Sequence, residues 1–564
     1  MSIGRIPSPE QWARQKVAGL PVRWRGRLLD KWLDTMAAYP QRVANIELRE
    51  SVGHLEKIRL PLSASDEEIR TEAKTLAAQC WQVGRLQIRD AEKVRQGMEQ
   101  FCRSHNVEPP DDEVTYQGAV GRMSCGTWWT RQLRKLHAKT VEGAAISLGY
   151  VNRARDCYVS NESLERRRQQ NRRNNRMMEQ TLLRNELGDE FTLAELAAKG
   201  VANKSIRRGE LMTRIAGFER IAMDCGHEGL FLTVTCPSRM HKWISVGHRS
   251  AVAENKKFDG TTPKEAQKYL SAVWARIRAA LARAELGVYG FRVAEPHHDA
   301  CPHWHLLLFH FAGAGKQIVE IVKRYALADS PDERGAKEHR VKAVVMDASK
   351  GTAAAYIAKY IAKNIDGLYV GNDLFGNPAM ETSNRVEAWA GIWGIRQFQQ
   401  IGGAPVGVWR ELRRVKELPA DAPESLKVAH EAVNRIEIGE DVKPAAWDAY
   451  IRAQGGAFVG RGAEITLAVE ESDEVGRYGE IKAPAPVGVA VADFVVRSAR
   501  HVWEVVRGGF KVLGGVVSAP WTRVNNCTRW EGENGGNKKI DSAIGWKKYI
   551  PEGRGGGINN LAFG

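Results

Sequence analysis

Two apolar segments joined by a short, proline-bounded connection constrain the fold of this chain more than any other feature of its sequence. Residues Val288–Glu295 and His303–Phe311 have the composition of β-strands, and the residues from Pro296 to Pro302 have that of a turn. Because strands joined by so short a connection pair in opposite directions, these segments predict an antiparallel β-hairpin.

Neighbouring segments predict what surrounds the hairpin. Residues 230–235 form another short, apolar, strand-like run, which Pro237 closes. Residues Thr262–Ala284 repeat apolar side chains with helical spacing, and Pro263 suits the first turn of a helix. Strand, helix, hairpin and a later helix predict an α+β fold, in which helices cover one face of a central antiparallel sheet.

Composition divides the 564 residues into four parts. At 43% hydrophobic and 27% charged residues, the chain can bury sizeable cores. Residues 1–215 repeat apolar side chains every three or four positions, which predicts a mostly helical, basic region. We predict the α+β domain over 216–414, a mixed region of unknown role over 415–530, and a disordered Gly- and Asn-rich tail over 531–564.

The net charge of +16 implies an anionic partner, and nucleic acid is the leading candidate. Eight cysteines are too few for a disulfide scaffold and fit a reducing cytoplasm. Residues 1–15 are polar and interrupted by prolines, so no signal peptide is expected, and no apolar run is long enough to span a bilayer. We therefore expect a cytoplasmic protein without a membrane partner.

Arginines concentrate between residues 151 and 176, where eight arginines accompany three acidic residues. This composition has two interpretations, the solvated face of a helix or a helix that contacts the phosphates of a nucleic acid. The candidates for such phosphate contacts are Arg166, Arg167, Arg168, Arg172 and Arg173.

A His-x-His pair in the second strand of the hairpin is the sharpest chemical signal. Side chains two positions apart lie on the same face of a strand, so His303 and His305 present two imidazoles side by side. Glu295, at the end of the preceding strand, would complete a metal site and would help it accept Mg²⁺ or Mn²⁺ as well as softer ions. The alternative is that the histidines only form hydrogen bonds. His297 and His298 are rival ligands, but their place in the turn predicts that they face solvent.

A second signal lies in residues 355–364. On a helix, Tyr356 and Tyr360 are about 40° apart around the axis and about 6 Å apart along it, and Lys359 and Lys363 lie beside them. The phenols are candidate nucleophiles with neighbouring cations, although tyrosines at this spacing are usually ordinary packing. The adjoining stripe, expected to be buried, consists of Ile357, Ile361 and Ile365.

Together these residues predict a device for cutting a DNA phosphodiester. A metal ion held by His303, His305 and Glu295 would neutralise charge that develops on a phosphate oxygen. A tyrosine hydroxyl would attack phosphorus and expel the 3′ oxygen, so that the energy of the phosphoester bond is kept in a phosphotyrosine link.

The order of these motifs resembles that of the HUH endonucleases of the rolling-circle replication initiator branch. More narrowly, it is similar to the replication gene A protein family of P2-like phages. Histidines precede tyrosines in this branch, whereas conjugative relaxases have the reverse order. The matching segments are Phe231–Thr235, Glu295–His305, Tyr356–Gly367, Trp393–Gly403 and Trp409–Arg414.

The resemblance implies a fold, a reaction and a set of site residues. The fold would be an HUH- or RRM-like palm. The reaction would nick one strand of a phage replication origin through a 5′-phosphotyrosine intermediate, leave a 3′-OH primer for rolling-circle replication, and later rejoin the strand. Tyr356 and Tyr360 would attack in turn beside Lys359 and Lys363, and the metal would be Mg²⁺ or Mn²⁺.

The implied partners are single-stranded or supercoiled phage origin DNA in the cytoplasm of the bacterial host. Residues 313–316 lack the spacing of a nucleotide-binding loop, so a host replicative helicase would separate the strands and a host polymerase would extend the primer. Two alternatives stay open, an HUH transposase or relaxase with the same chemistry and a non-enzymatic basic DNA-binding protein. A histidine-triad hydrolase is disfavoured because Leu307 occupies the position of its third histidine.

Overall fold

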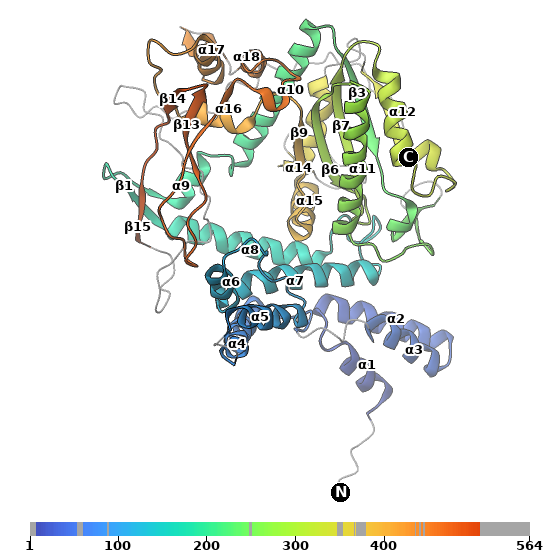
Figure 1. Cartoon of the computed structure of the whole chain (residues 1–564). Coiled ribbons are helices and arrows are strands. Elements are labelled where there is room, and N and C mark those ends of the chain that lie inside the picture. Colours follow the sequence, from blue (N-terminus) through green and yellow to red (C-terminus); the bar gives the residue numbers. More distant parts are fainter. Residues whose placement is uncertain are drawn as a thin grey trace. The chain divides into compact units, whose positions relative to one another are not determined.

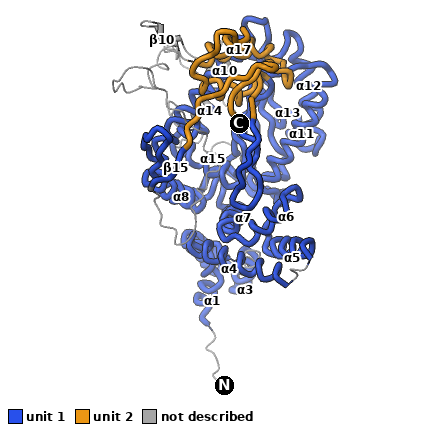
Figure 2. The backbone as a smooth tube through the Cα atoms, turned by 60° about the vertical axis from the view of Figure 1, so that its left-hand side comes forward, with its two compact units in different colours: residues 1–402, 470–485, 503–523 blue, residues 403–469, 486–502, 524–564 orange. Residues whose placement is uncertain are grey.

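The computed structural model describes residues 7–53, 60–86, 90–246, 251–346, 353–365, 367, 379–434, 436–438, 441–443 and 446–507. The chain forms two compact units (Figure 2). The first comprises residues 1–402, 470–485 and 503–523, and the second comprises residues 403–469, 486–502 and 524–564. In the described part of the chain, no helix combines the length and the apolar character that crossing a membrane requires.

The N-terminal region is mostly helical, as predicted. Three of its helices begin after a serine whose side chain accepts a hydrogen bond from the first helical turn, Ser8, Ser65 and Ser160. The successive helices are α1 (Pro9–Val17), α2 (Val22–Ala38), α3 (Gln41–Gly53), α4 (Asp66–Arg85), α5 (Ala91–Ser104), α6 (Tyr116–Met123), α7 (Gly126–Ser147) and α8 (Asn161–Gln180).

A small sheet follows α8 and includes a strand from far along the sequence. Its strand order is β15-β1-β2, with β1 (Leu182–Asn185), β2 (Glu190–Thr192) and β15 (Trp503–Arg507). Two helices come next, α9 (Leu193–Ala198) and α10 (Lys204–Asp224). The predicted domain boundary at 215/216 falls inside α10, and the predicted tail over 531–564 lies outside the described residues. The division into four domains stays a prediction.

The first unit is built around a five-stranded sheet in which all neighbouring strands are antiparallel (Figure 1). Its strand order is β8-β3-β7-β6-β9, with β3 (Glu228–Val234), β6 (Tyr289–Pro296), β7 (Pro302–His310), β8 (Val341–Val345) and β9 (Phe398–Ile401). Strands β6 and β7 form the predicted hairpin, in which Glu295 lies opposite His303. The prediction of a central antiparallel sheet is therefore confirmed.

Helices cover both faces of this sheet, so the prediction of helices on one face is wrong. Helices α11 (Pro263–Arg283) and α12 (Gly315–Ala326) share a core with Leu306 and Leu308 on one face. On the other face, Phe218 of α10 packs against Phe291, with ring centroids 5.6 Å apart, and helix α14 (Ala353–Ile365) covers Phe231. The physical reason is that both faces of β3, β6 and β7 carry large apolar side chains, which need to be buried.

Further elements complete the two units. The first unit also contains β4 (Trp243–Ser245), β5 (Val252–Glu254), α13 (Ala336–His339) and α15 (Ala379–Trp393). The second unit has a core in which the rings of Trp409, Trp447 and Tyr450 lie against one another. Its elements are α16 (Val406–Leu412), α17 (Glu424–Val433), β10 (Ile436–Ile438), β11 (Asp441–Lys443), α18 (Trp447–Ala453), β12 (Ile465–Glu470), β13 (Ala485–Val491) and β14 (Phe494–Arg497).

One glycine in the hairpin is required by the close approach of the two strands. Gly290 has φ +150°, and a Cβ atom placed there would lie 2.0 Å from the carbonyl oxygen of Leu307. We expect Gly290→Ala to lower the free energy of unfolding by about 3 kcal/mol or more, because backbone rather than a flexible side chain would have to move. Chemical denaturation of the full chain measures this loss.

A control for that prediction is Gly97→Ala in α5. A Cβ atom at Gly97 would meet only Val83 Cγ1, at an ordinary contact distance of 3.5 Å. We expect this change to raise the free energy of unfolding by up to about 1 kcal/mol, because alanine restricts the unfolded chain. Equal denaturation midpoints for the two variants would contradict the argument about Gly290.

Candidate active site

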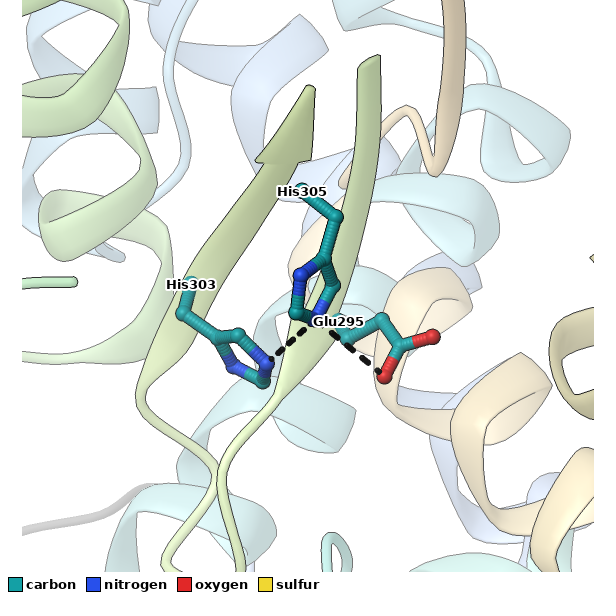
Figure 3. Close-up of side chains that lie close together, drawn as sticks. All are labelled: Glu295, His303 and His305. Atoms are coloured by element: carbon teal, nitrogen blue, oxygen red, sulfur yellow. Dashed lines mark hydrogen bonds and ion pairs between the residues drawn. The ribbon is translucent and has the colours of Figure 1, made fainter. Parts of the chain in front are cut away.

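Two histidines and a glutamate from the hairpin lie side by side on one face of the sheet (Figure 3). The Nε2 atoms of His303 and His305 are 3.0 Å apart, and His305 Nε2 lies 3.9 Å from Glu295 Oε2. Strand alternation puts both histidines of β7 on this face, and the pairing of β6 with β7 puts Glu295 opposite His303. All three predicted ligand residues are therefore brought together.

Glu295 is almost fully buried, with 1% of its surface exposed, and two side chains of α14 hold it. Lys363 Nζ lies 3.1 Å from Glu295 Oε2, and Asn364 Nδ2 donates a hydrogen bond to Glu295 Oε1. Burial alone raises the pKa of this carboxyl group. The charge of Lys363, the electrostatic effect of the neighbouring His305 ring and the hydrogen bonds from Asn364 and Lys363 outweigh burial, so the pKa of Glu295 is lowered and the carboxylate stays ionised.

Both imidazoles are kept neutral. Burial lowers the pKa of His305 to about 4, although the neighbouring Glu295 acts in the opposite direction. Burial, together with the neighbouring His297 and His305, lowers the pKa of His303 well below its usual value. The hydroxyl of Thr233 on β3 lies 3.0 Å from His305 Nδ1 and thereby fixes the orientation of that ring. A neutral imidazole is the form that binds metal ions, and the contact of Thr233 with Nδ1 leaves Nε2 of His305 for this purpose.

This donor set fits a divalent metal ion. The three ligand atoms all lie within 4.8 Å of one another. An ion with bonds of about 2.1 Å to nitrogen and oxygen keeps its ligand atoms roughly 3–4 Å apart, so small side-chain adjustments would close the cluster around it. In the ranges that the structure describes, no other group of three His, Cys, Asp or Glu side chains meets this distance.

The two tyrosines of α14 lie over the same face of the sheet. The ring of Tyr360 is centred 4.2 Å from that of His305, and the ring of Phe231 is centred 5.2 Å from Tyr356 and 5.6 Å from Tyr360. Burial, followed by the charges of Glu295 and Tyr356, raises the pKa of the Tyr360 phenol. Tyr356 is more accessible, with 44% of its surface exposed. Tyr360 therefore lies directly against His305, and Tyr356 lies on the same side of the sheet, against Phe231.

The rest of the predicted tyrosine helix can be compared only in part. The stripe expected to be buried is buried, as Ile357, Ile361 and Ile365 each expose 1% of their surface or less. Lys363 reaches Glu295, whereas the side chain of Lys359 lies outside the described residues. Of the two predicted lysines, only Lys363 is therefore connected here to the metal-ligand candidates.

The turn between β6 and β7 differs from its prediction. His298 is buried and His297 is half-buried, so the expectation that both face solvent is wrong. Asp299 explains this difference, because its buried carboxylate accepts a hydrogen bond from the Cys301 N–H and lies 3.1 Å from His241 Nδ1, which draws the turn inward. The ring of His297 then lies against that of His303, with centroids 4.1 Å apart.

The arginine-rich segment forms helix α8, and its arginines fall into two groups. Arg166 donates hydrogen bonds to two backbone carbonyls of the segment before α4, and Arg167 pairs with a carboxylate of α15. Arg168, Arg172 and Arg173 are exposed. Arg166 and Arg167 therefore have structural partners outside α8, and Arg172 pairs with Glu165 of the same helix. Contact of any of the five arginines with DNA stays a prediction.

Several residues of the site are absent from the sequence-based assignment. The sequence suggested no site role for Asn364, and it placed Thr233 only within a strand. Tyr158 lies three residues before α8, yet its ring lies under the ammonium group of Lys363, with Nζ 5.4 Å from the ring centroid. Strand alternation could have suggested Thr233, whereas no local pattern in the sequence marks Tyr158.

Comparison with known proteins places the chain among phage replication proteins. It is 31% identical over 561 residues to the probable replication protein P12 of Pseudoalteromonas phage PM2, covering 92% of this chain and 84% of that protein. It is 36% identical over 454 residues to the replication gene A protein of Escherichia phage 186, covering 76% of this chain and 63% of that protein.

A relative from a bacterial genome is named as an endonuclease. The chain is 31% identical over 484 residues to the probable replication endonuclease from prophage-like region 1 of Salmonella typhi, covering 83% of this chain and 58% of that protein. The chain thus spans less than two thirds of the phage 186 and Salmonella relatives. No solved structure matches. Residues 54–368 match the bacteriophage replication gene A protein family, and the chain belongs to that family.

Proposed function

We propose that this protein is a site- and strand-specific DNA endonuclease and strand-transfer enzyme that starts rolling-circle replication of a phage genome. The observation that carries the proposal is the meeting of His303, His305 and Glu295 with the two phenols of α14 on one sheet face. The relative from Salmonella typhi, named a probable replication endonuclease, supports the nuclease part of the proposal. The HUH-type palm belongs to the proposal as well.

Histidines 303 and 305 and Glu295 would hold Mg²⁺ or Mn²⁺. When bound, such an ion supplies electrostatic stabilisation of the negative charge that develops on the oxygens of the scissile phosphate. The residues around these ligands prepare them for this task. Lys363 and Asn364 keep Glu295 ionised and oriented, and Thr233 fixes the ring of His305.

The tyrosines would carry out the transfer. The Oη atom of one tyrosine forms a bond to phosphorus while the bond from phosphorus to the 3′ oxygen breaks. The phenol loses its proton, the departing 3′ oxygen gains one, and the downstream DNA stays attached through its new 5′ phosphate as a phosphotyrosine. After one round of synthesis the second tyrosine would cut the regenerated origin, and the 3′-OH released by that cut would attack the first phosphotyrosine, free its phenol and rejoin the strand. One helical turn between the two phenols suits attack on the same phosphate position.

The other predicted roles form part of the same proposal. The exposed arginines of α8 would contact phosphates of the origin DNA. The substrate would be single-stranded or supercoiled origin DNA in the cytoplasm of the host, and its strands would have to be separated for replication. A host replicative helicase would open them, and a host polymerase would extend the 3′-OH primer.

The test is an incubation of the full chain with labelled DNA. The probes are single-stranded oligonucleotides that tile the replicon encoding the chain, labelled at the 3′ end, with Mn²⁺, Mg²⁺ or a chelator. We expect one oligonucleotide to transfer its label to the protein in a link that survives denaturation, only when metal is present. Peptide mapping should place the label on Tyr356 or Tyr360.

The companion experiment uses the same oligonucleotide labelled at the 5′ end. We expect a shorter free fragment that a DNA polymerase can extend, because the reaction leaves a 3′-OH. Binding of DNA without any cleavage or covalent link, in either metal, would instead favour the non-enzymatic DNA-binding protein.

A further inference from the structure

A segment of the N-terminal region forms part of the wall of the candidate active site. Tyr158 lies three residues before the start of α8 and exposes only 2% of its surface. Its backbone N–H donates a hydrogen bond of 3.2 Å to the carbonyl oxygen of His298, in the turn between β6 and β7. This turn carries Glu295 at one end and His303 near the other, so Tyr158 is fixed to the connection between two ligand candidates.

The backbone of Tyr158 has an unusual conformation. Its φ is +70°, a value that bulky side chains rarely adopt and that surrounding contacts must enforce. Two sets of contacts to the residues that follow Tyr158 do so. Arg385 Nη1 donates to the carbonyl oxygen of Val159, and the buried carboxylate of Glu142 in α7 accepts hydrogen bonds from the backbone and the hydroxyl of Ser160. The fold therefore holds this tyrosine in place from both α7 and α15.

The ring of Tyr158 faces the cation that holds Glu295. Lys363 Nζ lies 5.4 Å from the ring centroid of Tyr158 and 3.1 Å from Glu295 Oε2. A desolvated ammonium group is attracted to the face of an aromatic ring at such a distance. The ring thus limits the positions that the Lys363 ammonium can take to those near Glu295.

We propose that Tyr158 is a positioning residue, which holds the Lys363 ammonium against Glu295 and so helps to orient a metal ligand. It follows that the region before the central sheet is part of the nicking site in addition to any role in DNA binding. This inference rests on the proposed function for its effect on the reaction, whereas the contact between Tyr158 and Lys363 can be measured without it.

The test is a double-mutant cycle in the full chain. Tyr158→Phe keeps the ring face, whereas Tyr158→Leu keeps apolar bulk without a ring. Each of these two variants is made in two backgrounds, one with the native Lys363 and one with Lys363→Gln, which removes the cation and keeps a hydrogen-bond donor. With Lys363 present, we expect single-turnover nicking to be about 3- to 30-fold slower for Leu than for Phe. In the Lys363→Gln background, we expect the two rates to agree within about twofold.

A role in packing alone would give a different pattern. The Leu variant would then be slower than the Phe variant by the same factor in both backgrounds, or the two would never differ, and either result overturns the proposal. Denaturation midpoints of the same four proteins provide a measurement that needs no activity. We expect the Phe-to-Leu change to lower the midpoint more with Lys363 than with Gln.

The denaturation midpoints test the positioning role of Tyr158 separately from the proposed function. An inactive wild type would overturn the proposed function, and the denaturation cycle would still decide whether Tyr158 holds Lys363. Additive midpoints overturn the contact and with it the positioning role. Coupled midpoints with uncoupled nicking rates show a contact that does not orient the site, which also overturns the inference.

Discussion

The double variant Tyr356→Phe/Tyr360→Phe is expected to form no covalent link to DNA. The ring of Tyr360 lies against His305 and that of Tyr356 against Phe231, and phenylalanine keeps these ring contacts while it removes the hydroxyl that would attack phosphorus. Loss of a nucleophile lowers the rate of such reactions on the order of 10⁴-fold or more. The measurement is the amount of protein that retains 3′-labelled origin oligonucleotide after denaturation.

The two single variants should separate cutting from rejoining. Each keeps one phenol, so each is expected to form the covalent link with the remaining tyrosine. Neither is expected to complete the cycle, because the second transfer needs the other phenol. Release of a rejoined single-stranded circle from a substrate with two origin copies measures that second step.

A matched control lies on the opposite face of the sheet. Tyr269 belongs to α11, which packs on the face away from the histidines, and Tyr269→Phe removes one hydroxyl as the active-site variants do. We expect this variant to cut and rejoin at the rate of the wild type. A covalent link that persists in the double variant would show that neither tyrosine is the sole nucleophile.

The sequence predicted the histidine pair and the tyrosine pair separately, because the members of each pair are related by the regular spacing of a single strand or helix. Alternation in a strand puts His303 and His305 on one face, and helical spacing puts Tyr356 beside Tyr360. The hairpin also places Glu295 opposite His303, since the two strands are adjacent in the chain. What spacing alone could not give is the packing of α14 over Phe231, which joins the two halves.

The wrong predictions share a physical origin in long-range packing. The turn with His297 and His298 has polar composition, which predicts exposure, but the buried Asp299 and the hydrogen bond from Tyr158 draw it inward. Helices cover both faces of the sheet because α10 reaches it from the N-terminal region and packs Phe218 against β6. Contacts between residues far apart in the sequence leave no periodic signal in either segment.

Replacing either histidine should abolish nicking and leave DNA binding almost unchanged. His303→Ala or His305→Ala removes one of three ligands, and with it stabilisation of charge on the scissile phosphate, so we expect at least about 10²-fold slower nicking. Burial holds the pKa of His305 at about 4 and that of His303 well below its usual value, so neither ring is charged near neutral pH. Their removal therefore takes no positive charge from the surface that meets DNA.

Because both imidazoles are neutral, the histidine variants should bind DNA with the same salt dependence as the wild type. DNA affinity depends on salt through the number of phosphates that positive side chains neutralise. We expect the slope of log affinity against log salt concentration to be the same for both histidine variants and the wild type. The measurement uses the full chain and the oligonucleotide that it cuts, with a chelator present to prevent cleavage.

His310→Ala is the matched control, because His310 is a buried histidine of β7 that points to the opposite face of the sheet from His303 and His305. Its replacement removes the same group and leaves a similar cavity, so it should reproduce any general loss of stability while nicking continues. If His310→Ala slowed nicking as much as the other two variants, the loss would come from the fold. If all three nicked normally, the histidine pair would have no part in the chemistry.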